Sequence, residues 1–284
     1  MESQENQYRW PKAEAVYPDR PGRSYALKRL RYRLRAFSHR GLIAQFEQFI
    51  NQHPFLVKLL NEHADYSYPL VYRFLDKRFN RKQRFQAICD NLRFLPEKLT
   101  ALSTPIYKTP LSFGVVIPDF EMTLSMTTHQ PMEGYWVLEL WHKPRNELVY
   151  LPTFAKLGES LLISVVQGPN FEGSKEMVKQ LTKTCYGLRP AYLMVETMKA
   201  LTKVLGFNQL LGIPQKYQNK SRFIQSSHYV VDYDAIFAES GGQLKDYWEL
   251  PLEIDRNLDD VPSKKRSMYR KRYAMLDDLA KIGR

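Results

Sequence analysis

The chain has 284 residues, 44% of them hydrophobic and 25% charged, which is an ordinary composition for a globular protein of one large or two modest domains. It contains no run of eighteen apolar residues and begins with a polar, acidic segment, which argues against a membrane-spanning helix and a secretory signal. The formal net charge of +12 leaves nucleic acid, anionic lipid headgroups and phosphorylated cofactors as candidate partners.

The first part of the chain divides into an arm and a helical region. Residues 1–23 contain three prolines and no periodicity, which predicts an extended arm. Residues 24–105 show helical periodicity, and Asn80 is well placed to cap a helix over 81–95. The two cysteines, Cys89 and Cys185, cannot form a disulfide framework, so we expect a cytoplasmic protein. Its positive charge leaves peripheral contact with the inner membrane open.

The first helix of this region starts near Ser24 and combines an apolar stripe with a basic remainder. The stripe consists of Leu27, Leu30, Leu34 and Phe37. Five cations, among them Arg29 and Arg33, occupy other positions, and no acidic residue follows before Glu47. One interpretation docks the leucines in the core and leaves the cations in solvent. The other makes the basic face a binding site for the phosphates of lipid headgroups or nucleic acid.

From about Leu111 the pattern changes to the period of a strand, which opens a sheet domain over 106–284. The expected strands are 111–117, 121–126, 134–141, 147–154 and 161–167. Their short connections predict an antiparallel meander. Glu139 and His142 lie three residues apart on one strand, so we expect them on opposite faces of the sheet. Both are candidate acid–base residues, although such side chains are commonly ordinary surface residues.

The run 161–167 leads into a strand–helix–strand unit. Pro190 suits the first position of a helix over 190–205, and the apolar run 207–213 suits a buried strand. Two strands joined in this way form a parallel pair with a right-handed crossover. Because the amides at the front of the helix lack intrahelical partners, the turn Gly187-Leu-Arg189 is a candidate site for an anion.

The last part of the chain adds a polar loop and a basic helix. The loop 215–222 follows the second parallel strand, where open α/β sheets usually bind ligands. His228 and Tyr229 come next and are further candidate catalytic residues, and Asp234 is a candidate helix cap. A final helix over 264–282 carries cations for an anionic surface, namely Lys264, Arg266, Arg270 and Arg272. No spacing of cysteine and histidine resembles a zinc site, so we expect no metal.

Together these patterns predict an α+β or α/β fold with N-terminal helices followed by a mixed, largely antiparallel sheet that contains one βαβ unit. Several stretches also resemble the VirK/YbjX family of bacterial proteins, whose function is unknown. They are Gln167-Gly-Pro169, Gly187-Leu-Arg-Pro190, Tyr233-Asp234 with Gly241-Gly242, and Arg266-Ser-Met-Tyr-Arg-Lys-Arg-Tyr273. The resemblance implies a cytoplasmic protein of Gram-negative bacteria linked to virulence, antimicrobial-peptide resistance and envelope remodelling. A histidine common in the 215–222 loop of relatives is missing here.

The order of meander, glycine-containing turn, helix and strand also resembles the core of GNAT-type acyltransferases. In that fold the amides of the turn hold the pyrophosphate of coenzyme A. The segment Thr184-Cys-Tyr-Gly-Leu-Arg189 keeps only one glycine of the family's pattern. The candidate cofactor-binding residues are Gln167, Gly168, Gly187, Leu188, Arg189 and Asn219.

Two functions remain open from the sequence. The first is a GNAT-like acyl- or aminoacyl-transferase that acts on an envelope component, with acyl-CoA or another phosphorylated acyl donor as cofactor. Its candidate catalytic residues are Glu139, His142, His228 and Tyr229. The second is a non-enzymatic basic protein that binds an anionic membrane surface, or RNA or DNA, in envelope or virulence regulation. No familiar nucleic-acid motif accompanies the charge, so we rank nucleic acid below phospholipid headgroups.

Overall fold

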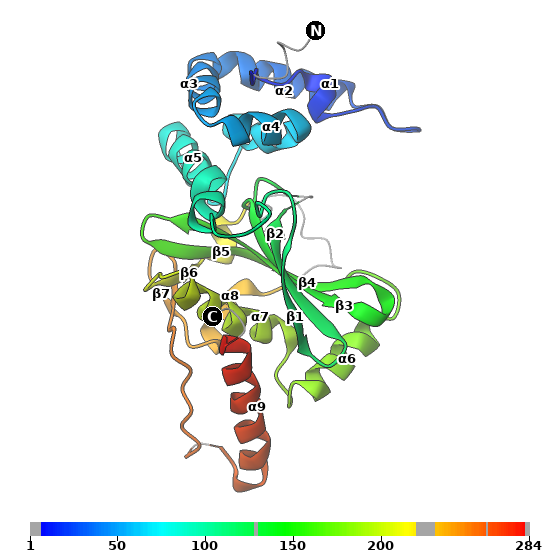
Figure 1. The fold of residues 1–284 in the computed structure, drawn as a ribbon, viewed down its shortest axis with the longest axis vertical. Coiled ribbons are helices and arrows are strands. Elements are labelled where there is room, and N and C mark those ends of the chain that lie inside the picture. Colours follow the sequence, from blue (N-terminus) through cyan, green and yellow to red (C-terminus); the bar gives the residue numbers. More distant parts are fainter. Residues whose placement is uncertain (1–6, 128–129, 220–230, 260, 282–284) are drawn as a thin grey trace.

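The computed structural model describes residues 7–127, 130–219, 231–259 and 261–281. Helices from the first part of the chain lie at one end of the long axis, a sheet crosses the middle, and the last helix forms the other end (Figure 1). This arrangement confirms the predicted α+β class. The helices before the sheet are α1 (Ala13–Val16), α2 (Ala26–Ser38), α3 (Arg40–Asn51), α4 (Pro54–Glu62), the 3-10 helix η1 (Ala64–Val71) and α5 (Arg81–Lys98).

Eight strands form one open sheet in the order β1-β2-β3-β4-β5-β6-β8-β7. They are β1 (Leu111–Ile117), β2 (Phe120–Met126), β3 (Trp136–His142), β4 (Glu147–Leu157), β5 (Ser160–Gln167), β6 (Leu210–Gly212), β7 (Gln243–Leu244) and β8 (Trp248–Leu250). All neighbours are antiparallel except β5 and β6, which are parallel. The predicted meander and the single parallel pair are confirmed. The strand β6 is shorter than expected, and β7 was not predicted.

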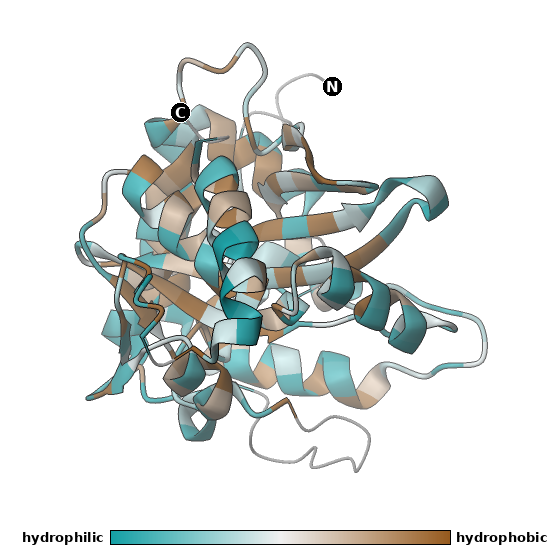
Figure 2. Cartoon of the chain, turned by 90° about the horizontal axis from the view of Figure 1, so that it is seen from below, coloured by the Kyte–Doolittle hydropathy of each residue, from teal (hydrophilic) through white to brown (hydrophobic). Residues whose placement is uncertain are grey.

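Further helices pack on the sheet or lie between its strands. They are η2 (Lys143–Arg145), α6 (Ser174–Thr184), α7 (Pro190–Val204), η3 (Gln215–Tyr217), α8 (Tyr233–Glu239) and α9 (Ser263–Lys281). The helix α7 begins at Pro190 as predicted, and its side chains Leu193, Met194 and Met198 are fully buried. This apolar side contacts β4 and β5. Figure 2 shows hydrophobic residues concentrated in the strands and on the helix sides that face them.

The orientation of α2 contradicts the one of the two interpretations that docks its apolar stripe in the core. Tyr32, on the opposite side of the helix, is the buried residue, and its hydroxyl donates to the carbonyl oxygen of Pro11 at 2.8 Å. Its ring also stacks on Trp10, with centroids 6.1 Å apart. The stripe itself stays exposed, because a cluster of aromatic rings from the N-terminal arm, α3 and η1 occupies the other side of the helix. The other members of this cluster are Tyr8, Tyr17, Phe46 and Tyr68.

The helix α5 joins the helical region to the sheet. Asn80 caps it as predicted, because its side chain accepts from the Lys82 and Gln83 amides and Gln83 bonds back to the Asn80 amide. Farther along, Asn91 bonds to both backbone groups of Lys156 on β4, at 2.7 and 2.8 Å. At this position β4 extends beyond its pairing with β3, so the Asn91 side chain takes the place of a missing strand.

Two glycines allow α8 to lie close to the sheet. A Cβ atom on Gly212 would lie 2.7 Å from the ring of Phe237, which is fully buried. A Cβ atom on Gly242 would lie 2.6 Å from the carbonyl oxygen of Phe237. Any larger residue at either position would displace α8. The cap of α8 is Asp232, whose carboxylate accepts from the Ala235 amide at 2.9 Å, so the prediction of Asp234 as the cap is wrong.

Burial in the helical layers shifts the pKa of three side chains, Cys89, Cys185 and His39. Burial raises the pKa of the Cys89 and Cys185 thiols to about 12. His39 lies between α2 and α5, with Nδ1 2.8 Å from the Arg35 carbonyl oxygen and Nε2 3.3 Å from Nη2 of Arg84. An oxygen acceptor on one nitrogen and a guanidinium donor on the other fix a neutral ring. Burial, followed by the charges of nearby arginines, lowers the pKa of His39.

Both edges of the sheet are irregular. The register between β1 and β2 shifts twice, between Ser112 and Val115 and between Val115 and Ile117. Gly114 lies within β1 with a φ of +75°, a conformation that suits glycine. At the other edge, β7 is only two residues long.

Candidate functional site

The parallel strands β5 and β6 diverge one residue after the end of β6. The last bond between them runs from the Ile213 amide to the Ile163 carbonyl oxygen at 3.0 Å. Beyond it, β5 continues to Gln167, whereas the other chain turns away at Pro214 into η3. The side chain of Gln218 occupies the opening, because its Nε2 donates to the Ser164 carbonyl oxygen at 3.0 Å. This opening is at the carboxyl ends of the parallel pair, where ligands of open sheets usually bind.

A carboxylate, an amide and a phenol gather at the end of β5. Glu133 is buried, and its Oε2 accepts from Nε2 of Gln167 at 3.1 Å. Burial raises the pKa of Tyr233, and the negative charge of Glu133 raises it further. At neutral pH this cluster therefore holds a protonated phenol close to a carboxyl group. Gln167 was predicted as a site residue from the sequence, but Glu133 was not.

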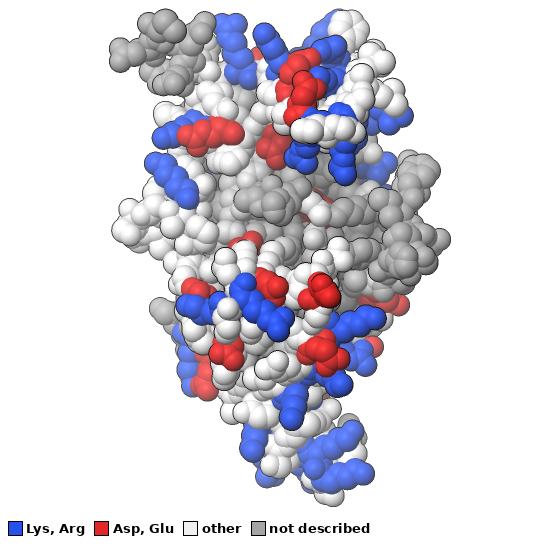
Figure 3. Space-filling view, turned by 90° about the vertical axis from the view of Figure 1, so that its right-hand side faces the viewer, with Lys and Arg blue, Asp and Glu red and all other residues white. Residues whose placement is uncertain are grey.

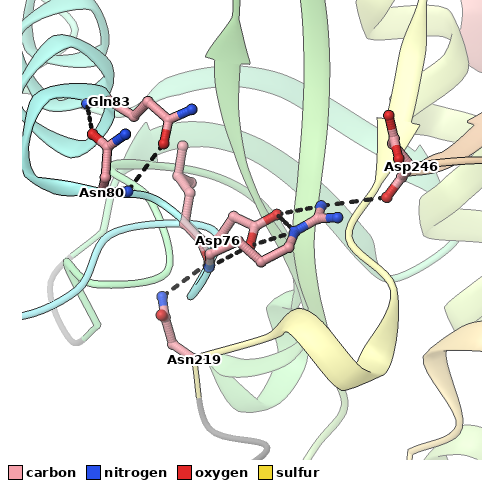
Figure 4. A network of polar contacts seen from close by, with 7 residues as sticks. Asp76, Asn80, Gln83, Asn219 and Asp246 are labelled. Carbon is pink, nitrogen blue, oxygen red and sulfur yellow. Dashed lines mark hydrogen bonds and ion pairs between the residues drawn. The ribbon is translucent and has the colours of Figure 1, made fainter.

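A buried ion pair forms the wall of the same region (Figure 4). The side chain of Asp76 is fully buried, and its two oxygens accept from Nε and Nη2 of Arg78 at 2.6 to 3.1 Å. The guanidinium lies over the ring of Tyr217, 3.7 Å from its centroid, and 4.9 Å from that of Tyr247. It also donates to the carbonyl oxygen of Asp246 at 3.3 Å. This pair thus joins the segment before α5 to η3 and to the turn before β8.

Asn219 connects the same segment to the loop before β3. Its Nδ2 donates to the carbonyl oxygen of Leu75 at 3.0 Å (Figure 4). The same nitrogen donates to the carbonyl oxygen of Met132 at 2.8 Å. Its backbone carbonyl accepts from Arg73 at 3.0 Å. The side-chain oxygen Oδ1 is buried and has no hydrogen-bond partner within the described part of the chain. Asn219, predicted as a cofactor-binding residue, therefore lies at the cluster, but its amide group already holds the backbone together.

The turn before α7 is arranged differently from a phosphate-binding turn. The Gly187 and Leu188 amides donate to the carbonyl oxygens of Thr182 and Cys185, at 2.8 and 3.0 Å, and thereby close the end of α6. On the outer side, Arg272 of α9 donates to the Tyr186 carbonyl oxygen at 2.8 and 3.2 Å. The two amides that the sequence offered for a phosphate are thus already satisfied.

Two of the predicted cofactor-binding residues remain to be placed. Arg189 directly precedes α7, and its guanidinium lies 5.9 Å from the ring centroid of Tyr192. The pKa of Tyr192 is raised by burial and by a hydrogen bond with Glu239. Gly168 follows β5, and a Cβ atom on it would lie 3.2 Å from the ring of Tyr150. Glycine at this position lets the chain pass close to that ring.

The predicted catalytic residues do not come together. Glu139 accepts from Thr123, Ser125 and Trp141 on one face of the sheet, at 3.1 to 3.3 Å. His142 lies three residues along the same regular pairing with β2 and packs against Phe120, with ring centroids 5.1 Å apart. The alternation of side chains along β3 places the two on opposite faces. His228 and Tyr229 lie outside the described residues.

The predicted anion-binding cations are largely engaged within the protein. Arg29 donates to the Tyr17 carbonyl oxygen and to Asp19, and Arg33 pairs with Glu14. In α9, Arg266 donates to the Val261 carbonyl oxygen at 3.0 Å, and Arg272 bonds as given above. Lys264 and Arg270 are exposed. The basic groups of α2 and α9 lie at opposite ends of the long axis (Figures 1 and 3).

A small hollow lies at the other end of α7, between this helix, α9 and the strands β1 to β3. Its lining includes Phe113, Met122, Leu138 and Leu201 and is almost entirely apolar. It offers nothing to orient a polar donor, so we place the candidate site at the polar cluster. Within the described ranges, no three histidine, cysteine or acidic side chains are grouped so as to hold a metal ion.

The residues that sequence reasoning missed are Asp76, Arg78 and Glu133. Asp76 and Arg78 were interpreted as part of a helical, basic region. Glu133 lies between a turn signalled by Pro131 and the expected strand 134–141. A turn normally predicts exposure, and only the tertiary structure buries this carboxyl group. Of the predicted residues, Gln167 and Asn219 belong to the cluster, whereas Gly187, Leu188 and Arg189 lie at the front of α7.

Comparisons with known proteins place the chain among proteins without an assigned activity. It is 79% identical over 275 residues to an uncharacterized protein of Haemophilus influenzae, covering 97% of this chain and 94% of that protein. It is 63% identical over 216 residues to a Mannheimia haemolytica protein named membrane protein LapB, covering 76% of this chain and 96% of that protein. The uncharacterized protein YbjX of Escherichia coli is 24% identical over 279 residues, 91% of this chain and 83% of YbjX.

No solved structure shows significant similarity to this chain. Across the described ranges, no helix is both long and apolar enough to cross a membrane. The family model described as protein of unknown function DUF535 matches residues 21–282. With that match and the YbjX similarity over most of the chain, the VirK/YbjX resemblance is confirmed, and the protein belongs to the DUF535 family.

Proposed function

We propose that this protein is a GNAT-like acyl- or aminoacyl-transferase that acts on a bacterial envelope component. The observation that carries the proposal is the cluster of buried polar groups where β5 and β6 part. The antiparallel meander, the crossover helix α7 and the single parallel pair occur in the order that the GNAT resemblance implies. That order supports a transferase, and the cluster supplies groups suited to its chemistry.

In the proposed reaction, an amine or hydroxyl of the acceptor attacks the carbonyl carbon of the donor. Glu133 takes the proton that the acceptor loses, and Gln167 orients the carboxylate. Tyr233 stays protonated at neutral pH and gives a proton to the leaving group as its bond to the carbonyl carbon breaks. Glu139 is an alternative base from the middle of the sheet, whereas His142 lies on the other face and cannot act with it.

The donor in this proposal is acyl-CoA or another phosphorylated acyl carrier. Because the Gly187 and Leu188 amides are already bonded, Arg189 is the group at the front of α7 that we assign to its phosphates. A charge-assisted hydrogen bond of this kind is worth about 1.5–3 kcal/mol. Arg189→Ala should therefore weaken donor binding by about tenfold or more.

Calorimetric titration with acyl-CoA, followed by a transfer assay, tests the proposal. The wild type should release heat on binding, and Glu133→Gln should keep binding the donor while losing transfer to an amine or hydroxyl acceptor. Arg145→Ala is the matched control for Arg189→Ala and should bind the donor like the wild type, because Arg145 is exposed and its ion pair with Glu147 spans 4.0 Å. If neither acyl-CoA nor an acyl phosphate gives heat or a thermal shift, the proposal fails.

A second candidate function is binding to an anionic membrane surface without chemistry. The exposed stripe of α2 and the cations around it favour this function, and so does the name membrane protein LapB carried by a relative. Binding of anionic vesicles by a protein that gives no signal with acyl donors would select it. Binding of RNA with a steep dependence on salt would instead select nucleic acid.

A further inference from the structure

We infer that α2 is a membrane-docking helix whose exposed apolar stripe enters the headgroup layer of an anionic bilayer. The inference rests on the membrane-surface function proposed above for the class of partner, and it names the surface that makes the contact. The stripe consists of Leu27, Leu30, Leu34 and Phe37.

The four side chains of the stripe are unusually exposed for their size. Their exposed fractions run from 51% to 70%, and together they are half of the eight large hydrophobic side chains exposed in the described residues. The other four are scattered over β1, β7, α7 and the turn before α7. Single exposed hydrophobic residues are common, but a continuous row of them on one helix indicates a surface that meets an apolar partner.

The helix cannot turn this stripe into the protein. Tyr32 lies opposite the stripe and is held by its hydrogen bond to Pro11 and its stack on Trp10. On the same side, Arg29 reaches the Tyr17 carbonyl oxygen at 2.7 and 3.0 Å. These contacts fix the rotation of α2 about its axis, so the stripe faces away from the molecule. Figure 1 shows α2 at the end of the long axis, where a flat surface can approach it.

The charge around the stripe selects an anionic surface. No aspartate or glutamate occurs from Arg20 to Phe46. Five exposed cations of this segment have no carboxylate partner in the described ranges, namely Arg20, Arg23, Lys28, Arg31 and Arg40. Figure 3 shows lysines and arginines gathered over this end of the molecule. An apolar stripe with a basic border is the pattern of helices that lie in a membrane interface, where each cation near the surface adds to the attraction.

The same charges disfavour a second copy of the chain as the partner. The stripe has the spacing of a coiled-coil seam, so two copies would place the residues beside the seam next to each other. Within α2 those flanking positions hold Arg31, which has no carboxylate partner in the described ranges, and Arg33, which pairs with Glu14. Such a dimer would gather the unpaired cations of this segment without adding an acidic residue of α2 to meet them, whereas an anionic membrane meets them with opposite charge.

Co-sedimentation of the full chain with vesicles tests the inference. Vesicles with a third of phosphatidylglycerol should bind the wild type, and pure phosphatidylcholine should bind it far more weakly. Replacing Leu30 and Leu34 with Glu should weaken binding to the anionic vesicles about tenfold or more, because it removes inserted surface and adds repulsion. The control is Val115→Glu, which changes a hydrophobic side chain of 57% exposure on β1 and should bind like the wild type.

Two further measurements keep the outcome interpretable. The double variant should keep the thermal midpoint of the wild type, because the changed side chains point into solvent. A wild type that binds no anionic vesicles would end the membrane-surface function itself, whereas a wild type that binds them through another surface would overturn only the assignment to α2. Light scattering should show the same molecular mass for both proteins. Equal vesicle binding by the double variant would overturn the inference, and so would a wild-type dimer that the variant breaks.

Discussion

The ion pair between Asp76 and Arg78 gives a sharp prediction about stability. In Asp76→Asn the side chain keeps one oxygen acceptor, but its new NH₂ group faces Nη2 of Arg78, which is 2.6 Å from Oδ2 in the wild type. Two donors then oppose each other in a place from which water is excluded, since the Asp76 side chain has no exposed surface. The substitution should therefore weaken the native state without changing the volume of the side chain.

The magnitude follows from how the two partners are buried. Removing one partner of a fully buried pair costs about 3–5 kcal/mol. The Arg78 side chain is 33% exposed and can regain water on one side, which reduces the cost. We expect Asp76→Asn to lower the free energy of unfolding by about 2–3 kcal/mol, which for a chain of this length corresponds to a fall of roughly 3–5 °C in the thermal midpoint.

Thermal and urea unfolding, followed by circular dichroism, measure this effect. Glu147→Gln is the control, because it breaks a pair that spans 4.0 Å with both side chains partly exposed and should change stability by less than about 0.5 kcal/mol. If the two substitutions have equal effects, Asp76 does not hold the wall of the cluster in the way its contacts suggest. The same result would also remove the reason for expecting a rigid site there.

Three further predictions concern packing, reactivity and pH. Gly212→Ala should destabilise the protein by about 1–3 kcal/mol in urea unfolding because of the aromatic ring against it, whereas Gly41→Ala, with open space on α3, should be neutral or slightly stabilising. At pH 8, Cys89 and Cys185 should react with a thiol reagent only slowly in the native protein and quickly in urea, because a pKa of about 12 leaves almost no thiolate; fast native labelling would contradict this. Because the pKa of His39 is lowered in the folded protein, the neutral ring stabilises the native state above its ordinary pKa near 6.5, and this stabilisation is lost as the pH falls. His39→Gln should therefore flatten the loss of stability between about pH 7 and 5. A variant with the same pH profile of stability as the wild type would refute this prediction.

The fold was readable where local chemistry decides structure. The five strands of the meander alternate and are separated by turn residues, and they appear within three residues of their predicted limits. Pro190 and Asn80 act locally, so the starts of α7 and α5 were predicted as well. Where a helix orientation depends on contacts with residues far away in the sequence, the prediction was wrong. The stripe of α2 has the spacing of a core face, and only the aromatic cluster around Tyr32 reverses it.

The site could be predicted only in part, for the same reason. Gln167 was found because the stretch Gln167-Gly-Pro169 resembles the VirK/YbjX family and directly follows the apolar run of a strand. Glu133 becomes a candidate base only because the fold brings its turn to the end of β5. For the turn at Gly187 the sequence suggested a site that the structure does not offer. The Gly187 and Leu188 amides had been expected to be free for a phosphate, but they donate to carbonyl oxygens at the end of α6.

The irregular margins of the sheet have a consequence for how copies of this protein behave in a crowded cell. An open sheet exposes unpaired backbone groups along its outer strands, and such strands recruit others into aggregates. Here the two register shifts near Gly114 make the edge strand β1 irregular. The other edge strand, β7, has only two residues and offers few backbone groups with which another strand could pair. The molecule therefore resists growth by strand addition, so copies at high concentration should stay separate rather than stack into fibrils.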